Sequence, residues 1–394
     1  MKKGWEYIDF KDVFPVKMGK TPPRGDKSSW DEKKETHNKW VSIADISNNE
    51  GKIIKDTKEY ISDSAAEKIN KVSKGSLLMS FKLSIGRMAF AGDDLYTNEA
   101  IIAIPESNKY TLRFMYYYLL SYNWLSLTEG NEKVKGATLN KSSIGKIQLP
   151  VISLSEQQSI VDYLDSAFAK IDAMKANAEK ALNEAKALFQ TSLKEMLEPK
   201  EGWEERKLQE VACDFSRGKS KHRPRNDKKL FGGKYPFIQT GDIRNSNIYV
   251  TSHSSTYNDI GLSQSKLWPK DTVCITIAAN IAEVAILKYP SCFPDSVIGF
   301  VGDKKKVDKL FVYFSLIKYQ QELKKQGKGS AQDNINLGTF EKNTFPFPSL
   351  QEQQSIVTSL DSLKSKVDRF QANYEKISQE CDALKQAILR QVFE

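Results

Sequence analysis

The stretch Ser153–Val161 reads Ser-Leu-Ser-Glu-Gln-Gln-Ser-Ile-Val, and it recurs at Ser349–Val357 as Ser-Leu-Gln-Glu-Gln-Gln-Ser-Ile-Val. Each copy opens a long segment that contains neither Gly nor Pro. A serine followed three residues later by glutamate, just before apolar residues, is the capping-box pattern of a helix start. The repeat therefore predicts two long helices, 155–198 and 351–394, with Ser153 and Ser349 as their N-caps.

The repetition extends over both halves of the chain. Trp5-Glu6 matches Trp203-Glu204, and three further segments match in the same order. These pairs are 40–46 with 237–243, 74–80 with 270–276, and 84–90 with 280–286. A single period of about half a chain is too long for a solenoid repeat. It indicates a duplicated unit that consists of a mixed domain followed by a long helix.

Each globular half shows the same order of elements. Apolar runs predict strands, and an aromatic patch after them predicts a helix. The predicted strands are 76–81, 88–91 and 100–104 in the first half and 272–277, 284–287 and 297–301 in the second; the predicted helices are 112–127 and 310–323. We expect a globular domain at 1–150, a helix at 151–199, a second globular domain at 200–347 and a second helix at 348–394.

The long helices carry apolar residues at alternating steps of three and four, the pattern of a coiled-coil seam. The predicted seam positions are Leu164, Phe168, Ile171, Leu182, Phe189, Leu360, Val367, Phe370, Ile377, Leu384 and Ile388. Antiparallel pairing of the two helices is economical, because each then carries its globular domain at the opposite end. The expected fold is α+β: two similar mixed α/β domains separated by two long antiparallel helices that form a coiled coil, with pseudo-two-fold symmetry. A charge at Ile377 or Leu384 should then be strongly destabilising.

Composition sets outer limits on the function. A chain of 394 residues is long enough for two or more domains, and its net charge of +9 is compatible with a polyanionic partner without requiring one. The four cysteines show no paired spacing, which favours a reduced, cytoplasmic protein. No apolar run reaches the length of a membrane span, and no signal-peptide pattern is visible.

Two basic, glycine-bearing loops stand at matching places, 19–30 and 217–229, and Asp227 is the only acid in the second. Lys and Arg on such loops suit phosphate contact, while Arg, Gln and Asn can read base edges. A pair of inverted domains also suits the dyad of duplex DNA. The candidate DNA contacts are Lys20, Arg24, Lys27, Lys82, Arg87, Lys133, Lys135, Lys141, Lys219, Lys221, Arg223, Arg225, Lys228, Lys324, Lys328 and Gln332.

Sequence motifs that would indicate catalysis are weaker than those that indicate DNA contact. Gly19-Lys20-Thr21 and Gly218-Lys219-Ser220 lack the earlier glycine of a phosphate-binding loop, so nucleotide binding is not expected there. Asp295 with Asp303 and Lys305 resembles the carboxylate–lysine pattern of metal-dependent nucleases, and a turn with a solvated edge explains it equally simply.

No metal, cofactor or catalytic residue is expected in this chain. The three histidines are not at ligand spacing with Cys or Asp. Asp45 and Asp242 occupy matching positions after strand-like runs, where a carboxylate is expected to cap a turn rather than to catalyse.

Taken together, these motifs resemble the specificity subunits of type I DNA restriction–modification enzymes. The resemblance covers the whole chain and is carried by the Glu-Gln-Gln run that follows Leu149, its copy after Phe345, the Trp-Glu starts and the two Asp-Ile pairs. It implies two target recognition domains, each of which reads one half of a split, asymmetric DNA sequence. It also implies that the paired helices set the gap between the halves and dock two methyltransferase subunits. Those partners would use S-adenosylmethionine, and restriction (motor–nuclease) subunits would use ATP and Mg²⁺.

Three hypotheses therefore stand side by side. The first is a non-catalytic DNA-reading and scaffolding subunit, the second a stand-alone metal-dependent nuclease, and the third a coiled-coil adaptor that binds proteins. The basic loops favour the first over the third. Differences between the loops indicate that the two halves read different sequences.

Overall fold

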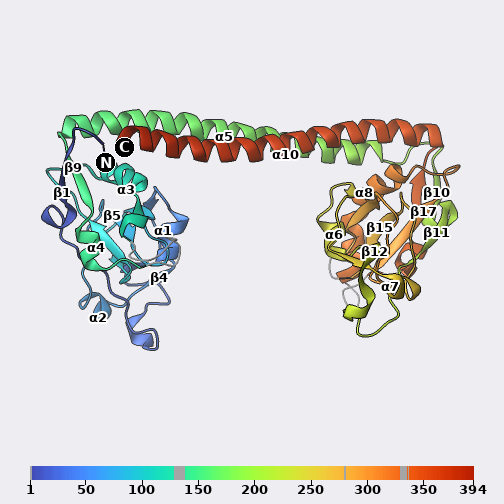
Figure 1. Ribbon diagram of the computed structural model, residues 1–394, viewed down its shortest axis with the longest axis horizontal. Helices are drawn as coiled ribbons and strands as arrows, with labels where there is room; N and C mark the ends of the chain where they lie inside the picture. The colour runs from blue at the N-terminus through green and yellow to red at the C-terminus, as the bar shows by residue number, and fades with distance from the viewer. Residues whose placement is uncertain (1, 128–137, 279–280, 329–334, 336) are drawn as a thin grey trace. The chain divides into compact units, whose positions relative to one another are not determined.

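The computed structural model describes residues 2–127, 138–278, 281–328, 335 and 337–394. The chain divides into two compact units (Figure 1). The first unit comprises Met1–Asn177 with Glu375–Glu394, and the second comprises Ala178–Tyr374. Both predicted long helices are present, as α5 (Leu154–Met196) and α10 (Leu350–Phe393). Each unit thus contains one globular part and a portion of both long helices.

The first unit is built on a four-stranded sheet in the order β3-β6-β5-β8. Its strand β3 pairs parallel with β6, and the other neighbours are antiparallel. These strands are β3 (Ile53–Ile54), β5 (Leu77–Ser80), β6 (Met88–Ala91) and β8 (Ile101–Ile104). The smaller sheets contain β1 (Glu6–Asp9) with β9 (Gln148–Val151), and β2 (Lys39–Val41) with β4 (Glu59–Tyr60) and β7 (Tyr96–Thr97). The helices are α1 (Ile43–Asn48), α2 (Asp63–Ala66), α3 (Leu112–Ser121) and α4 (Lys141–Gly145), with 3₁₀ turns at Phe10–Asp12, Lys27–Ser29 and Trp124–Leu127.

The second unit repeats this core and adds one strand, giving the order β11-β17-β15-β16-β13. Here β13 is the parallel edge strand, as β3 is in the first unit. The strands are β10 (Glu204–Arg206), β11 (Ala212–Arg217), β12 (Phe231–Phe237), β13 (Tyr249–Val250), β14 (Ser255–Tyr257), β15 (Val273–Thr276), β16 (Val284–Leu287), β17 (Val297–Gly302) and β18 (Phe345–Phe347). The helices are α6 (Thr240–Arg244), α7 (Asp259–Ser263), α8 (Lys309–Lys328) and α9 (Leu337–Lys342), with 3₁₀ turns at Leu208–Val211 and Lys228–Leu230.

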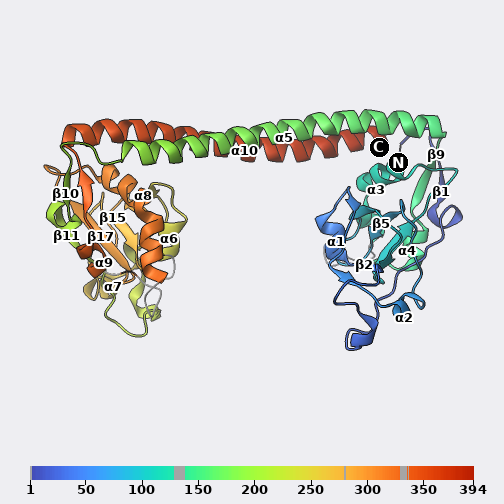
Figure 2. The same ribbon diagram turned by 180° about the vertical axis from the view of Figure 1, so that it is seen from behind.

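The central strand of each sheet is buried on both faces. In β5, Leu77 and Met79 join the cluster that includes α3 and the long helices, while Leu78 joins a cluster on the opposite face. Successive side chains of a strand point to opposite faces, so β5 reads as a continuous apolar run. In both views α3 lies between its sheet and the long helices (Figures 1 and 2). Strand β15 divides its side chains in the same way in the second unit.

The predicted aromatic helices differ in length from the observed ones. In the first unit, Tyr122 has extended backbone angles, so α3 ends at Ser121 and a 3₁₀ turn, Trp124–Leu127, follows. In the second unit, α8 runs on to Lys328. The strands 88–91 and 284–287 coincide with β6 and β16.

The Glu-Gln-Gln stretch fixes each long helix to its own globular part. The N-cap half of the expected motif is present, because the Glu156 amide donates to Ser153 Oγ at 3.2 Å and the Glu352 amide donates to Ser349 Oγ at 3.3 Å. Gln157, the middle residue of Glu-Gln-Gln, connects the long helix to other segments of its unit. Gln157 is fully buried; its Oε1 accepts from the Thr111 amide at 2.9 Å, and its Nε2 donates to the carbonyls of Lys109 and Ile152.

The second unit repeats this amide bridge without change. Gln353 is 1% exposed, and its Oε1 accepts from the Asp308 amide at 2.9 Å. Its Nε2 donates to the carbonyls of Lys306 and Pro348. Thr111 and Asp308 stand at the starts of α3 and α8, so each glutamine joins the N-terminal ends of two helices.

The two long helices run antiparallel where they meet in the first unit. There, Lys385 pairs with Asp172 at 2.5 Å, and Lys175 pairs with Asp382 at 3.5 Å. In the second unit, Lys186 Nζ donates to Gln371 Oε1 at 3.0 Å. Rising numbers on α5 thus meet falling numbers on α10.

The C-terminal end of each long helix completes the core of the other repeat. In the first unit, the Phe393 ring lies 5.5 Å from Tyr118 and 5.8 Å from Phe114. In the second unit, Phe189 lies 6.3 Å from Phe314, and Leu197 belongs to the same buried cluster. Each globular part is therefore covered by helices that come from both repeats.

Two of the predicted seam residues are misplaced. Phe370 and Leu384 are 41% and 46% exposed, so their assignment to the seam is wrong, and a charge at Leu384 is not expected to be costly. Near its end, α10 instead buries Cys381, Leu389 and Phe393. The steps there approach four residues, because the helix packs on α3 as well as on α5 and a straight helix drifts from a strict seven-residue repeat.

The other seam residues lie in or beside the helix interface. Ile377, Phe168 and Ile388 are partly buried. The remaining six are buried, namely Leu164, Ile171, Leu182, Phe189, Leu360 and Val367. Among the described residues, no helix combines the length and the apolar character that crossing a membrane requires.

Replacing Gln157 or Gln353 with Ala should lower the free energy of unfolding by about 3 kcal/mol, because each change strands a buried backbone amide and two carbonyls. Gln158→Ala and Gln354→Ala are matched controls at exposed neighbours and should change it by less than about 0.5 kcal/mol. Urea unfolding measures both. Equal losses from the buried and the exposed glutamines would contradict the bridge.

Phe393→Ala should destabilise the first unit by about 3 to 5 kcal/mol, because it opens a cavity among Phe114, Tyr118 and Trp5. Leu384→Ala, at an exposed position of the same helix, is the control. Hydrogen exchange should accelerate at the amides of α3 and stay unchanged at those of β15. Unchanged protection of α3 in Phe393→Ala would refute the packing role.

Candidate nucleic-acid interface

Both predicted basic loops begin with a glycine pressed against the neighbouring backbone. In the first unit, the Gly19 amide donates to the Ile101 carbonyl, and a Cβ on Gly19 would lie 2.1 Å from the Thr97 oxygen. In the second unit, the Gly218 amide donates to the Val297 carbonyl, and a Cβ there would lie 2.4 Å from the Phe293 oxygen. The glycines of the Gly-Lys-Thr and Gly-Lys-Ser triplets thus permit close approach of two chain segments.

Two tryptophans and a glutamate hold the side chain of Arg24 in the first loop. We call the residues that hold such an arginine its seat. The Arg24 guanidinium lies 4.2 Å from the centre of the Trp30 ring and 4.8 Å from that of Trp40, and it forms a two-pronged pair with Glu59. The two indoles meet edge to face at 5.2 Å. Contact with aromatic faces and a carboxylate limits the orientations of a guanidinium far more than a surface ion pair does.

The second loop has a seat of different composition. Arg225 Nη2 donates to Asp295 Oδ2 at 2.7 Å, and Arg223 lies 3.9 Å from the same oxygen. Arg217 Nε donates to the Asp295 main-chain oxygen at 2.7 Å. Asp295 follows Pro294, next to the residues that receive Gly218, so one short segment holds both the start and the middle of the loop.

The middle of the second loop is also braced from within. His222 Nε2 lies 2.9 Å from Asp227 Oδ2, and the Asp227 Oδ1 accepts from the Lys229 amide. These hydrogen bonds, the one from the Lys229 amide first, lower the pKa of Asp227 below its usual value. The His222 amide donates to Gln264 Oε1 at 3.0 Å, so the brace reaches the end of α7.

The comparisons with known proteins agree with this repeated geometry. Residues 2–184 and 200–379 both match the model of the type I restriction modification DNA specificity domain. The chain belongs to that family.

Individual relatives are distant. The specificity subunit of the type I restriction enzyme MjaIX from Methanocaldococcus jannaschii is 28% identical over 137 residues, which cover 34% of this chain and 32% of the relative. The EcoR124I/EcoR124II specificity subunit from Escherichia coli is 25% identical over 270 residues, covering 65% of this chain and 64% of the relative. A chain from a structure of a type I restriction–modification system has the same fold, with a TM-score of 0.77 at 17% identity, covering 100% of this chain and 98% of that one.

The predicted contact residues of the two specificity domains fall into two groups. Arg24, Arg87, Arg223, Arg225 and Lys324 are paired with carboxylates. A second group of cations has no ion pair within 4 Å among the described residues: Lys20, Lys27, Lys82, Lys141, Lys219, Lys221 and Lys228. Lys133, Lys135 and Gln332 lie outside the described residues, as does the side chain of Lys328.

The predicted contact residues of the first unit do not all face the same part of its surface. The side-chain hydroxyl of Thr21 lowers the pKa of Glu99 by a hydrogen bond, and the charges of Lys82 and Arg24 act in the same direction. Thr21 of the first loop therefore contacts Glu99 directly. Arg87 points elsewhere, to Glu50 beyond the end of α1.

The nuclease interpretation is wrong on geometric grounds. Asp295 precedes strand β17 and Asp303 follows it, and a six-residue strand spans roughly 20 Å. Asp295 is engaged by arginines, while Asp303 Oδ1 accepts from the Lys305 amide. Two carboxylates so far apart cannot share a metal ion.

Asp45 and Asp242 cap the starts of helices, whereas the sequence predicts that they cap turns. The Asp45 carboxylate accepts from the Ser42 amide at the start of α1, and Asp242 accepts from the Gln239 amide at the start of α6. Both form capping boxes.

Sequence reasoning missed the groups that orient the arginines. Trp30 ends the first basic loop and Trp40 opens the repeated segment 40–46, but nothing in the sequence indicates that they converge on Arg24 with Glu59. The segment Pro294-Asp295 was singled out, but for metal binding.

Asp295→Ala should free the second loop without unfolding its domain, because it removes the carboxylate that holds Arg225 and Arg223. Trypsin should then cleave after Arg225, Lys228 and Lys229 several times faster in native conditions. Asp303→Ala is the control, since it changes a carboxylate of the same domain away from the loop. Identical cleavage rates in both variants would show that Asp295 does not hold the loop.

Proposed function

We propose that this chain is the non-catalytic DNA-reading subunit of a type I restriction–modification complex, in which each specificity domain reads one half of a bipartite, asymmetric site. The two long helices would set the gap between the half-sites and dock the methyltransferase subunits. The complex would act in the cytoplasm, on double-stranded DNA.

The observation that carries the proposal is the pair of arginine seats. Near the start of each basic loop a glycine packs against the segment that precedes a core strand of its own unit, and each loop presents an arginine paired with a carboxylate. Arginine in a fixed orientation suits bidentate recognition of guanine in the major groove. The seats differ in composition, with Trp30 and Trp40 in one and Asp295 with His222 nearby in the other, which supports two different half-sites.

The unpaired lysines supply the second requirement. Lys20, Lys27, Lys219, Lys221 and Lys228 are exposed and lie in or beside the same loops. Cations without a carboxylate partner can neutralise phosphates and release counterions, a sequence-independent contribution that falls with salt.

The cofactors belong to the partners in this proposal. The methyltransferase subunits would bind S-adenosylmethionine, and restriction subunits would add ATP- and Mg²⁺-dependent translocation and cleavage. This chain would position the methyltransferase subunits on the DNA and determine which DNA sequence the complex recognises. Methylation mapping of the host genome, with and without the chain, should reveal a single split sequence that depends on it.

Lys219→Glu combined with Lys221→Glu should weaken binding of the assembled methyltransferase complex to its mapped site at least tenfold at 0.15 M salt. The slope of log K against log salt should fall by about 2, since two phosphate contacts are lost. Lys304→Glu with Lys305→Glu, at exposed positions in the same domain, carries the same charge change and should have little effect. Fluorescence anisotropy on a labelled duplex measures both.

Two outcomes would overturn the proposal. One is a footprint of the wild-type complex that protects no defined bipartite sequence. The other is an equal loss of DNA affinity in both double variants, because the loops would then act only through net charge. Retention of the methyltransferase subunits by both variants separates DNA reading from a protein-adaptor role.

A further inference from the structure

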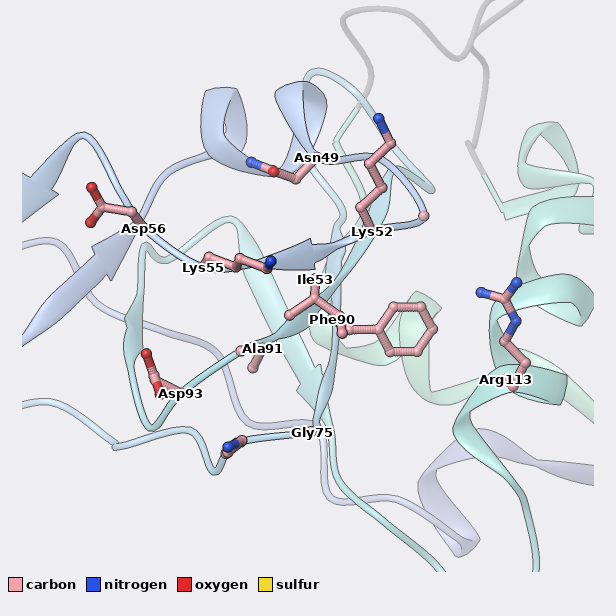
Figure 3. Close-up of a pocket in the computed structure, with 13 residues that line it drawn as sticks. Asn49, Lys52, Ile53, Lys55, Asp56, Gly75, Phe90, Ala91, Asp93 and Arg113 are labelled. Atoms are coloured by element: carbon pink, nitrogen blue, oxygen red, sulfur yellow. The ribbon is translucent and has the colours of Figure 1, made fainter. Parts of the chain in front are cut away.

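The first unit has an open groove outside the two basic loops. Its volume is about 1190 Å³, and it is lined by β3, the start of the turn after β6, the turn at Lys74–Gly75 and Arg113 of α3. Figure 3 shows Ile53 and Phe90 at its centre, with Arg113 on one side and Asp93 on the other. Ile53 belongs to an edge strand and is 56% exposed. The floor of the groove is therefore apolar.

In the second unit, larger side chains occupy the positions that correspond to this groove. Ile53 pairs with Phe90 in the register in which Tyr249 pairs with Ile286, so Tyr249 stands at the position of Ile53. Lys288 lies 5.0 Å from the centre of the Tyr249 ring.

At two positions beside the edge strand, the first unit has a glycine where the second unit has a charged side chain. Gly75 corresponds to Asp271, since each amide donates to the last residue of the neighbouring strand, and Gly92 corresponds to Lys288. Asp271 pairs with Lys309 at 2.5 Å. Gly75 and Asp271 share a left-handed backbone, with φ of +87° and +71°, so the turn itself accepts an aspartate.

The rim of the groove carries positive charge that the described residues leave unpaired. Lys52, Lys55 and Lys74 are exposed and have no ion pair within 4 Å in the part of the chain that the structure describes. The two rim carboxylates are engaged. Asp93 pairs with Lys39, and Asp56 accepts from the Tyr60 hydroxyl at 2.6 Å and lies 3.5 Å from Lys34.

We propose that this groove, in the first unit only, docks a short acidic segment of a partner protein that places one apolar side chain between Ile53 and Phe90. The site goes beyond DNA reading. An acidic peptide matches the three lysines, and its apolar residue matches the floor. A DNA backbone has the charge but no apolar group to cover Ile53, and phosphates set over an apolar floor would lose solvation without replacement.

The test uses the full-length chain and a panel of labelled octapeptides, each with one Leu, Ile, Met or Phe flanked by Asp and Glu. Fluorescence anisotropy should show saturable binding of at least one peptide. The same sequence with Ser in place of the apolar residue, and a short DNA duplex, serve as comparison probes and should bind at least tenfold more weakly at this site.

Substitutions that introduce the second unit's residues into the groove test whether the peptide binds there. Ile53→Tyr with Gly75→Asp installs the residues found at Tyr249 and Asp271 and should weaken peptide binding at least tenfold. Lys74→Glu, at an exposed position that the fold does not use, should weaken it at least fivefold. Lys270→Glu, the equivalent change in the second unit, should leave it unchanged.

The proposal is overturned if no peptide of the panel binds, or if the Ser peptide binds equally well. It is also overturned if Lys74→Glu has no effect, or if it lowers duplex affinity instead, because the groove would then belong to the DNA surface. Lys74→Glu keeps the test decisive should the double variant fail to fold.

Discussion

The buried glutamine amide at the start of each long helix is the constraint on which the rest of the structure depends. Gln157 and Gln353 each satisfy one backbone amide and two carbonyls from two separate segments. A buried carboxamide that meets all of these groups has one position and one orientation, since any displacement leaves polar backbone atoms unpaired. The direction in which each long helix leaves its globular part is set at this point.

Fixing that direction has a consequence for the far ends of the helices. The end of α10 brings Leu389 and Phe393 into the first core, and the end of α5 brings Leu193 and Leu197 into the second. Neither globular part is therefore complete without a helix that begins in the other repeat. In each unit, the glutamine bridge positions one long helix, and the terminal aromatic and aliphatic residues of the other long helix complete the core.

The sequence predicted the repeated and local features well. The long helices and the buried strands follow from periodicity and from short motifs, because those patterns depend on neighbouring residues. Asp45 and Asp242 were expected to cap turns and instead cap the starts of α1 and α6. The Gln157 bridge was missed, since a glutamine after a capping glutamate looks like a solvated first turn. The seam prediction failed at Phe370 and Leu384, which are exposed; near Leu384 the end of α10 packs on α3 as well as on α5. The seats of Arg24 and Arg225 require contacts between segments 35 and 70 residues apart, which a single sequence does not reveal.

Comparison of the two repeats separates what the fold requires from what it leaves free. The glutamine bridges, the close glycine contacts of the loops and the order of the central strands occur in both halves, and each is explained by buried polar groups or by packing. The arginine seats differ, and so do the residues around the parallel edge strand, where Tyr249 and Lys288 cover one sheet and Ile53 leaves the other open. Apart from Trp40, which is buried, the residues that differ are at least partly exposed, and a substitution there costs little stability. The two halves can therefore diverge at these positions while they keep the glutamine bridges and the packed cores that they share.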